Sequence, residues 1–347
     1  MRFKGWRYSP LVFYKRLKHP EVENIGFLTV LYAGTTSIFS FKYSFLNDIV
    51  KKLKRRSVSA GNIFFYRKNG TSEILRNETV INTENIKLIS VHVPTHLRPA
   101  NDDQFGHYLA GLIDGDGHFS SKQQLVIVFN SLDVSLAYYI KKRLSFGSVK
   151  KVKDKNAFLL VIAARLGLEK VIDLINGKIR KENKFNQITN NILNHDKYAE
   201  FRKKTSFKLN LNNDLKNHWL AGFADADASF QVKILNRRNR IEVRLNFQID
   251  QKKDRILILI KDFFGGNIGY RKTQDTYYYG STSFGSAKKV INYFDYFHLL
   301  SSKHINYLKW RKAYIIIQNR DHLNKNGIEK IIKLKNTMNR LRETTTV

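Results

Sequence analysis

The chain has 347 residues, with 61 Lys and Arg against 29 Asp and Glu, which gives a formal net charge of +32 at pH 7. It contains no cysteine, so disulfide scaffolds, cysteine-ligated metal sites and thiol nucleophiles are excluded. Its hydrophobic content of 42% is enough for folded cores, and its length allows two or three domains. The excess of positive charge predicts a polyanionic partner. Nucleic acid is favoured over a membrane, since no segment reaches the roughly 18 to 20 apolar residues needed for a span.

The first hundred residues differ in composition from the rest. All four prolines lie there, which predicts a domain boundary near residues 99–103. We expect residues 1–103 to be a basic N-terminal extension of unknown role. Its run KKLKRR at residues 51–56 fits a phosphate-binding arm and a solvated face about equally well. The uncharged stretch from Ile25 to Phe41 is diluted by polar residues and predicts a buried pair of strands or helices.

After residue 103 the chain repeats itself. The segment HYLAGLIDGDGHF at 107–119 returns as HWLAGFADADASF at 218–230, an offset of 111 residues. Two similar segments at this distance predict two related halves with an internal pseudo-twofold axis. The predicted domains are a first half at 104–205, a linker at 206–217 and a second half at 218–347.

Each half is expected to contain a motif helix, two strands, a helix, two more strands and closing helices. Residues 241–249 alternate strictly between apolar and polar side chains, which is typical of a strand with one buried face. The side chains expected to face the core are those of Ile241, Val243, Leu245, Phe247 and Ile249. Aligning Phe129 with Phe247 gives the first half an outward face made of Gln124, Val126, Val128 and Asn130.

The motif helices carry small residues that allow close packing. Ala110 with Gly111, and Ala221 with Gly222, leave a helix face bare enough for a partner helix to approach. The first helix is expected to end near Gly117, with that glycine in a left-handed cap.

Four acids fall in the last turns of these helices. Asp114 and Asp116 in the first motif recur as Asp225 and Asp227 in the second, where the helix dipole disfavours carboxylates. A lone Asp-x-Asp is more often a helix cap or a loop acid, but its duplication on two Ala-Gly helices points to a compensating cation. If the helices pack about a twofold axis, Asp116 and Asp227 meet and either share a proton or bind a divalent metal, for which oxygen ligands favour Mg²⁺. Beside a polyphosphate, this predicts metal-assisted phosphodiester hydrolysis.

At these residues the sequence resembles the LAGLIDADG homing endonucleases in their single-chain, two-motif form, over about residues 104–340. The resemblance implies an α+β fold of two pseudo-symmetric αββαββα halves, whose strands form a DNA-binding saddle in the major groove. It implies a monomer that cleaves both strands of DNA at a long, asymmetric intron-insertion site with Mg²⁺. In that pattern Asp116 and Asp227 bind metal, while Asp114 and Asp225 belong to the helix interface. The second motif departs by placing Ala228 where Gly is usual, at an expected cost of about 1 kcal/mol in a left-handed turn.

The resemblance also implies further active-site residues. Gln251 matches a water-ordering glutamine, Arg255 a basic residue, and Lys303 a lysine that neutralises developing phosphate charge. In the first half, the positions aligned with the glutamine and the basic residue are Asp133 and Ala137. Candidates there for the lysine are Lys181 and Lys184.

Outward polar side chains on the strands are suited to base edges, and Lys and Arg near turns are suited to phosphates. The second-half candidates for DNA binding are Gln231, Lys233, Arg237, Arg238, Arg240, Glu242, Arg244, Asn246, Gln248, Arg271 and Lys272. The first half offers Gln124 and Asn130, with Val126 and Val128 between them. The two valines fit contacts with thymine methyl groups or, alternatively, weaker DNA reading in that half.

Two other functions stay open at this point. An intron RNA maturase is the alternative, because some members of the family splice their host intron and bifunctional members keep both acids. A purely architectural DNA-binding protein is disfavoured, because it has no need of the paired acids. The abundance of Lys, Asn and Ile is typical of an AT-rich genome, and with the family resemblance it points to a mitochondrion or another organelle.

Overall fold

The computed structural model describes residues 26–32, 35–41, 88–237 and 240–338, and it divides the chain into two compact units, 1–86 and 87–347. In the first unit, the described residues form an antiparallel pair of strands, β1 (Gly26–Tyr32) and β2 (Thr35–Phe41). The basic run at 51–56 lies outside the described residues. Among the residues that are described, no helix is long and apolar enough to cross a membrane.

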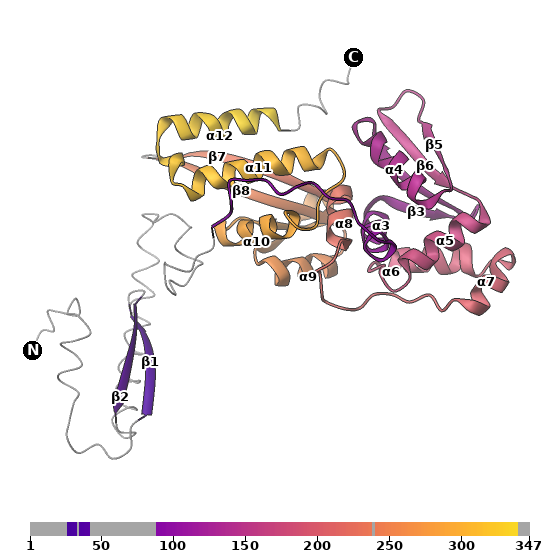
Figure 1. Cartoon of the computed structure of the whole chain (residues 1–347), viewed down its shortest axis with the longest axis horizontal. Helices are drawn as coiled ribbons and strands as arrows, with labels where there is room; N and C mark the ends of the chain where they lie inside the picture. Colours follow the sequence, from indigo (N-terminus) through magenta and orange to yellow (C-terminus); the bar gives the residue numbers. More distant parts are fainter. Residues whose placement is uncertain (1–25, 33–34, 42–87, 238–239, 339–347) are drawn as a thin grey trace, which may run out of the picture. The chain divides into compact units, whose positions relative to one another are not determined.

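The second unit contains two halves with the same order of elements (Figure 1). The first half consists of α3 (Asp102–Asp116), β3 (Gly117–Ser120), β4 (Gln124–Asn130), α4 (Val134–Leu144), β5 (Ser148–Lys151), β6 (Ala157–Ile162), α5 (Arg165–Ile175), α6 (Glu182–Ile188) and α7 (Ala199–Lys204). The second half consists of α8 (Trp219–Asp227), β7 (Ala228–Arg237), β8 (Arg240–Gln251), α9 (Arg255–Phe264), β9 (Asn267–Arg271), β10 (Thr276–Ser281), α10 (Phe284–Phe294), α11 (Lys303–Gln318) and α12 (Lys325–Thr337).

Each half has one four-stranded antiparallel sheet, in the orders β3-β4-β6-β5 and β7-β8-β10-β9. The fold predicted from the sequence, two similar α+β halves led by the motif helices, is therefore confirmed. Helices cover one face of each sheet, and Leu125, Ile127, Leu245, Phe247 and Ile249 are buried there. The prediction that Ile241 faces the core is wrong. It is 45% exposed, because it lies close to the β7–β8 turn, beyond the part of the strand that the helices bury.

Strand register corrects the alignment of the two halves. Phe119 pairs with Leu125, whereas Phe230, at the same position of the repeat, pairs with Phe247. Leu125 rather than Phe129 therefore corresponds to Phe247. The shift of four residues is even, so the predicted outward face of β4 is unchanged.

The two hairpins next to the motif helices differ in length. In the first half the pairing of β3 with β4 stops at Ser120 and Gln124. The corresponding pair in the second half is Gln231 with Asn246, and six further pairs follow it up to Arg237 with Arg240. At about 3.3 Å per residue, the β7–β8 hairpin extends roughly 20 Å further.

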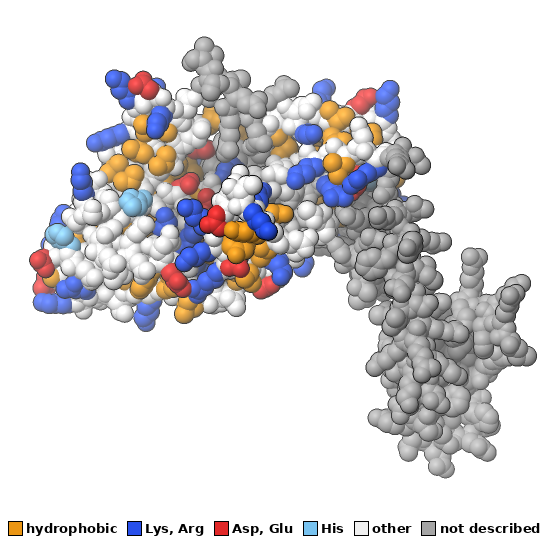
Figure 2. All heavy atoms as spheres, turned by 180° about the vertical axis from the view of Figure 1, so that it is seen from behind, with side chains coloured by type: hydrophobic (Ala, Val, Ile, Leu, Met, Phe, Trp, Pro, Cys, Tyr) orange, Lys and Arg blue, Asp and Glu red, His pale blue; other side chains and the backbone are white. Residues whose placement is uncertain are grey.

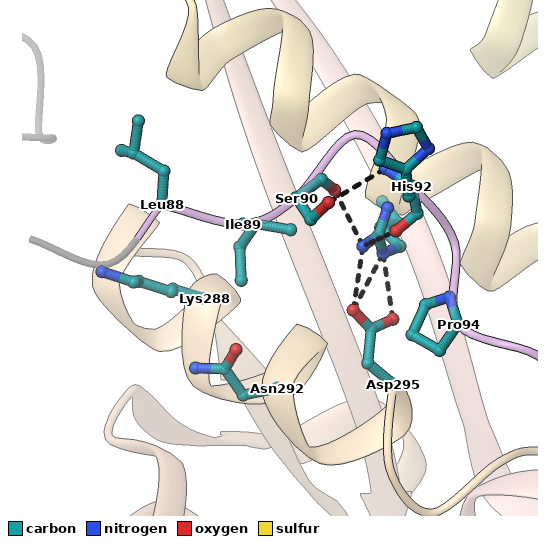
Figure 3. Close-up of a pocket in the computed structure, with 9 residues that line it drawn as sticks. Leu88, Ile89, Ser90, His92, Pro94, Lys288, Asn292 and Asp295 are labelled. Atoms are coloured by element: carbon teal, nitrogen blue, oxygen red, sulfur yellow. Dashed lines mark hydrogen bonds and ion pairs between the residues drawn. The ribbon is translucent and has the colours of Figure 1, made fainter.

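An extended segment, the N-terminal strap (residues 88–100), lies beside α10 and α11 (Figure 1). Ile89 exchanges two hydrogen bonds with the side chain of Gln318. Arg311 donates to the carbonyl oxygens of Ser90 and His92 and also pairs with Asp295. Figure 3 labels these three partners. The strap thus belongs to the same compact unit as the two halves. A boundary at residue 103 stays a prediction.

Candidate active site

The two motif helices, α3 and α8, pack against each other through their glycines. A Cβ atom on Gly111 would lie 1.8 Å from the carbonyl oxygen of Trp219, and one on Gly222 would lie 1.9 Å from that of Tyr108. Only glycine permits so close an approach of the two backbones. Tyr108 and Trp219 occupy the same position of the repeat, so the two contacts are related by a pseudo-twofold axis.

The first acid of each motif is buried in this helix pair. Asp114 accepts hydrogen bonds from Trp219 Nε1 at 2.9 Å and from the backbone N–H of Arg180 at 2.8 Å. Asp225 accepts from the Tyr108 hydroxyl and from the backbone N–H of Leu300, both at 2.7 Å. Burial raises the pKa of Asp114 to about 6 and also raises that of Asp225, although these hydrogen bonds oppose the shift. Each carboxylate therefore joins its own half to the motif helix of the other half.

The second acid of each motif ends its helix and faces out of the pair. Asp116 is exposed to solvent and Asp227 is half-buried. Oδ2 of Asp227 lies only 3.4 Å from the position that a Cβ atom on Gly115 would take, so the two helix ends meet. Partial desolvation, followed by the like charge of Asp227, raises the pKa of Asp116 to about 6, even though its side chain stays accessible. Two carboxylates that oppose each other in this way fit a divalent cation.

Other acidic or histidine side chains do not complete a metal site. Within the described part of the chain, no group of three or more His, Asp or Glu residues is arranged to hold a metal ion. A cation held by Asp116 and Asp227 would take its remaining ligands from backbone oxygens, water or a bound phosphate. Mg²⁺ prefers this kind of site, with one or two carboxylates and retained water.

The chain leaves both motif helices in a different conformation from the one predicted. Gly117 has φ −75° and ψ 150°, and Ala228 has φ −87° and ψ 157°. The expected left-handed cap is wrong, because each residue is already the first residue of a strand. The cost assigned to Ala228 in a left-handed turn therefore does not arise.

Two of the predicted residues gather around the second motif. Gln251 donates to Oδ2 of Asp227 at 2.7 Å. Lys303 donates to the carbonyl oxygens of Ala226 at 2.6 Å and Ala224 at 3.2 Å, and its charge opposes the rise in the pKa of Asp116. Arg255 instead forms an exposed ion pair with Glu182 of the first half.

The first half supplies a lysine but no matching glutamine. Lys184 is as buried as Lys303, each being 8% exposed, and it donates to the carbonyl oxygen of Gly117. Burial, and then the charge of Lys181, lower the pKa of Lys184. The strand register places Phe129 where the second half has Gln251.

Several contacts of this site were not predicted from the sequence. Asp133, which was aligned with the glutamine, accepts a hydrogen bond from the backbone N–H of Ser302 at 2.6 Å, where α11 begins. Ser301 donates to Asp225 through its hydroxyl at 2.5 Å. The aromatic pair Tyr108 and Trp219 was detectable, since an aromatic residue stands at the same position of both motifs.

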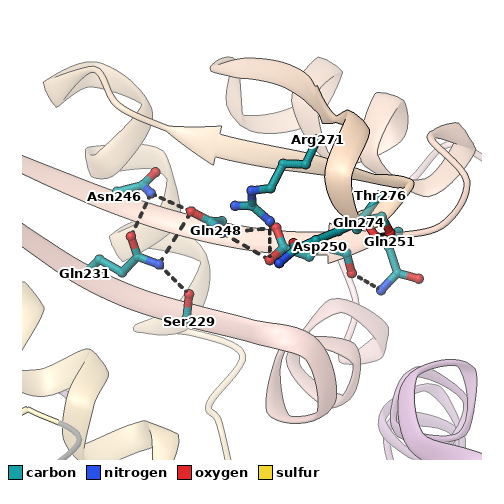
Figure 4. Close-up of polar contacts among 9 residues, drawn as sticks. All are labelled: Ser229, Gln231, Asn246, Gln248, Asp250, Gln251, Arg271, Gln274 and Thr276. Carbon is teal, nitrogen blue, oxygen red and sulfur yellow. Dashed lines mark hydrogen bonds and ion pairs between the residues drawn. The ribbon is translucent and has the colours of Figure 1, made fainter.

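The outward face of the second sheet carries a connected row of polar side chains (Figure 4). Asn246 donates to Gln231 and to Gln248, each at 3.2 Å, and Gln248 donates to Asp250 at 3.0 Å. Arg271 pairs with Asp250 at 3.0 Å. Asn246 is only 4% exposed, because its polar neighbours cover it on the outward face.

The basic candidates for DNA binding surround this row. Arg237 and Arg244 both pair with Glu242, at 3.3 and 2.6 Å, while Lys233 and Lys272 are exposed. Arg238 lies outside the described residues, as does the side chain of Arg240. On the face seen in Figure 2, Lys and Arg side chains are spread widely, with Asp and Glu interspersed.

Comparison with known proteins agrees with this geometry. A family profile described as LAGLIDADG endonuclease matches residues 220–314. An uncharacterized cox1 intron-2 protein of 37.2 kDa from Schizosaccharomyces pombe is 64% identical over 320 residues, which cover 89% of this chain and 97% of the relative. The intron-encoded DNA endonuclease aI3 of Saccharomyces cerevisiae is 29% identical over 270 residues, which cover 63% of this chain and 65% of the relative.

Solved structures share the fold. The LAGLIDADG meganuclease I-AabMI, bound to uncleaved DNA, matches with a TM-score of 0.55 and 23% identity over 68% of this chain and 99% of its own. I-SmaMI, bound to its uncleaved DNA target in the presence of calcium ions, matches with a TM-score of 0.53 and 24% identity. The match covers 67% of this chain and 98% of the I-SmaMI chain. With the paired motifs, the family profile and the cox1-intron relative establish that the chain belongs to the intron-encoded LAGLIDADG homing endonuclease family.

Proposed function

We propose that this protein is a site-specific endonuclease that cleaves both strands of a long, asymmetric DNA site, the sequence into which its intron inserts. One observation carries the proposal. The second acid of each motif lies at the meeting point of two helix ends and faces outward, whereas the first acid of each motif is buried and fully engaged in hydrogen bonds. This arrangement fits a pair of metal ligands, the second acids, on a helix pair that the buried first acids hold rigid.

We propose roles for the surrounding residues that their contacts support. Asp116 and Asp227 would hold the divalent metal, for which we propose Mg²⁺. Bound there, such a cation polarises the scissile phosphate and lowers the pKa of an attacking water. Gln251, which donates to Asp227, would orient water beside that acid. Lys303 and Lys184, at the two helix ends, would stabilise charge on the phosphate.

The test is cleavage of a DNA duplex that joins the two exon sequences across the insertion site. We expect double-strand breaks with Mg²⁺, and binding without cleavage with Ca²⁺. A duplex in which the intron already interrupts the site is the matched control and should stay intact. If a correctly folded protein bound the joined duplex and left it uncut at every Mg²⁺ concentration, the endonuclease proposal would be wrong.

An RNA maturase is the second candidate, because the intron-encoded RNA maturase bI4 of Saccharomyces cerevisiae is 28% identical over 182 residues, half of this chain. The experiment that separates the candidates is splicing of the host intron RNA with the purified protein. Splicing that persists in an Asp116→Asn variant would identify a maturase function independent of the metal site.

We further propose that the protein acts as a monomer in the mitochondrion. The internal pseudo-twofold axis supplies both acids from one chain, so a second copy is not needed to complete the site. The cox1-intron relative and the Lys-, Asn- and Ile-rich sequence support the mitochondrial location. Fractionation of cells that express a tagged chain would test it.

A further inference from the structure

The outward face of the first sheet carries four apolar side chains on its two central strands. Val126 of β4 pairs with Val161 of β6, and Val128 pairs with Leu159. All four, which we name the apolar square, are at least partly exposed, and Val128 is 49% exposed. The residues at the same register in the second half are Gln248, Asp250, Tyr278 and Gly280. The second half thus has two polar side chains on β8 where the first half has two valines on β4, and a tyrosine and a glycine on β10 where the first half has Leu159 and Val161.

The apolar square is not part of the protein core. Its neighbours along the strands, such as Leu125, Ile127 and Leu160, point to the other face and are buried there. A contiguous apolar patch on a sheet face is a candidate binding surface.

Basic residues lie beside the apolar square, on the edge strand β5 and in the β3–β4 and β5–β6 turns. Lys150 pairs with Leu159 on the same face. The turns at the two ends of the hairpins add Lys122, Lys153 and Lys155, all exposed, against one acid, Asp154. These lysines fit contacts with the phosphates of a nucleic acid beside an apolar centre.

The spacing of the square matches a DNA duplex. Side chains at positions i and i+2 of a strand are about 6.7 Å apart, which is close to two base steps of about 3.4 Å each. In the major groove, thymine is the base whose edge carries a methyl group, whereas the other edges present hydrogen-bond donors and acceptors. Those polar groups would lose their water against valine and leucine and gain no partner in return.

We infer that the apolar square reads the C5-methyl groups of thymines, so that the half-site under the first half is recognised by its methyl pattern. This inference rests on the proposed function. It assigns sequence specificity to Val126, Val128, Leu159 and Val161, whereas the second half reads its half-site through polar side chains.

Deoxyuridine provides the test, since it differs from thymidine only by the missing methyl group. Duplexes with single deoxyuridine substitutions along the joined-exon target would be titrated with the full chain in Ca²⁺. Each substitution under the apolar square should weaken binding by about threefold to fourfold, the equivalent of one buried methyl group. Substitutions under the second half are the matched control and should change binding by less than about twofold.

A Val128→Thr variant, which keeps the shape and replaces one methyl group with a hydroxyl, tests the contribution of Val128. It should reduce the sensitivity to deoxyuridine at one position, because threonine keeps only one of the two methyl groups of valine, and leave it unchanged elsewhere, with an unchanged melting temperature. If binding were equally insensitive to deoxyuridine in both half-sites, the inference would fail while the endonuclease proposal stood. If Val128→Thr weakened binding of intron RNA instead, the square would be an RNA surface. Failure of the folded protein to bind the joined duplex at all would count against the proposed function itself.

Discussion

The two halves of this protein share a topology but differ in two respects. Their first hairpins differ in length, and the outward faces of their sheets carry different side chains. The β7–β8 hairpin of the second half continues for six residue pairs beyond its counterpart and carries Lys233, Arg237 and Arg244 there. The β3–β4 hairpin of the first half is shorter, and the outward face of the first sheet is apolar at its centre. Within the helix pair, by contrast, the halves remain close copies. The helix pair must satisfy two sheets at once, so its contacts are constrained on both sides, whereas the outward faces are free to diverge.

The shared centre gives the largest predicted effect. Asp116→Asn and Asp227→Asn should each reduce double-strand cleavage by about a thousandfold or more, because each removes a charge that a bound cation requires. Binding in Ca²⁺ should persist. Cleavage of supercoiled plasmid measures the first quantity and gel mobility the second. Asp262→Asn, at an exposed position of α9, is the matched control. Near wild-type cleavage by either active-site variant would show that the acids were wrongly assigned.

The unequal hairpins predict unequal specificity. The half-site under residues 230–284 should tolerate fewer base substitutions than the half-site under residues 117–164. Arg244→Ala should relax specificity at one or two base pairs by about 1–3 kcal/mol, whereas Val126→Ala should change it much less, since a bidentate polar contact discriminates more than a methyl contact. Profiling of every single-base variant of the target tests this. If the two half-sites tolerated base substitutions equally well, the predicted difference in specificity between the halves would be wrong, and the maturase alternative would be favoured.

The absence of a glutamine opposite Gln251 predicts that the two strands are cut at different rates. Gln251 touches Asp227, while Phe129 holds the equivalent register in the first half. Gln251→Ala should slow cleavage of one strand by about 10- to 100-fold, as expected for loss of a group that orients a ligand, and should leave the other strand nearly unchanged. Strand-specific end labels would show it. A uniform loss on both strands would indicate that Gln251 supports the whole site.

A fall in pH should reduce the stability of the second half before that of the first half. Burial lowers the pKa of His304 to about 4, and that of the neighbouring His298 is lowered too; both rings lie beside His96 of the strap. The unfolded chain binds a proton at His304 near pH 6.5 and the folded chain only near pH 4, so stability falls as the pH drops through this window. For His304 the shift in pKa sets an upper limit of about 3 kcal/mol on the loss of unfolding free energy. The actual loss should be smaller, because solvent reaches part of the ring.

Hydrogen exchange at pH 7 and pH 5 would measure this difference. Amides of α11 should lose protection before those of α5, because the histidine cluster packs at the start of α11. A His304→Phe variant should take up about one proton fewer on unfolding in this range. Equal loss of protection in both halves would show that the cluster does not set the acid response.

Much of this protein could be predicted from local sequence pattern. The repeated motif predicted the two halves, and its Ala-Gly face predicted the paired helices. The strict alternation at 241–249 predicted the outward side of β4. Each of these patterns can be read along the chain without knowing which distant residues are in contact. The even side-chain period of a strand explains why that side was correct despite an alignment error of four residues. A hydrogen bond between distant segments leaves no such pattern, and Asp133 with Ser302 or Lys184 with Gly117 could not be found in this way.

What only the tertiary structure decided is therefore how the two halves are joined and where each sheet ends. Gly117 and Ala228 are extended because a strand starts at once, a constraint set by the sheet rather than by the helix they follow. The reciprocal contacts of Tyr108 with Asp225 and Trp219 with Asp114 arise only when α3 and α8 touch. The sequence determined which residues repeat, and packing determined which of them meet, because burial and hydrogen bonding act between residues that are distant along the chain.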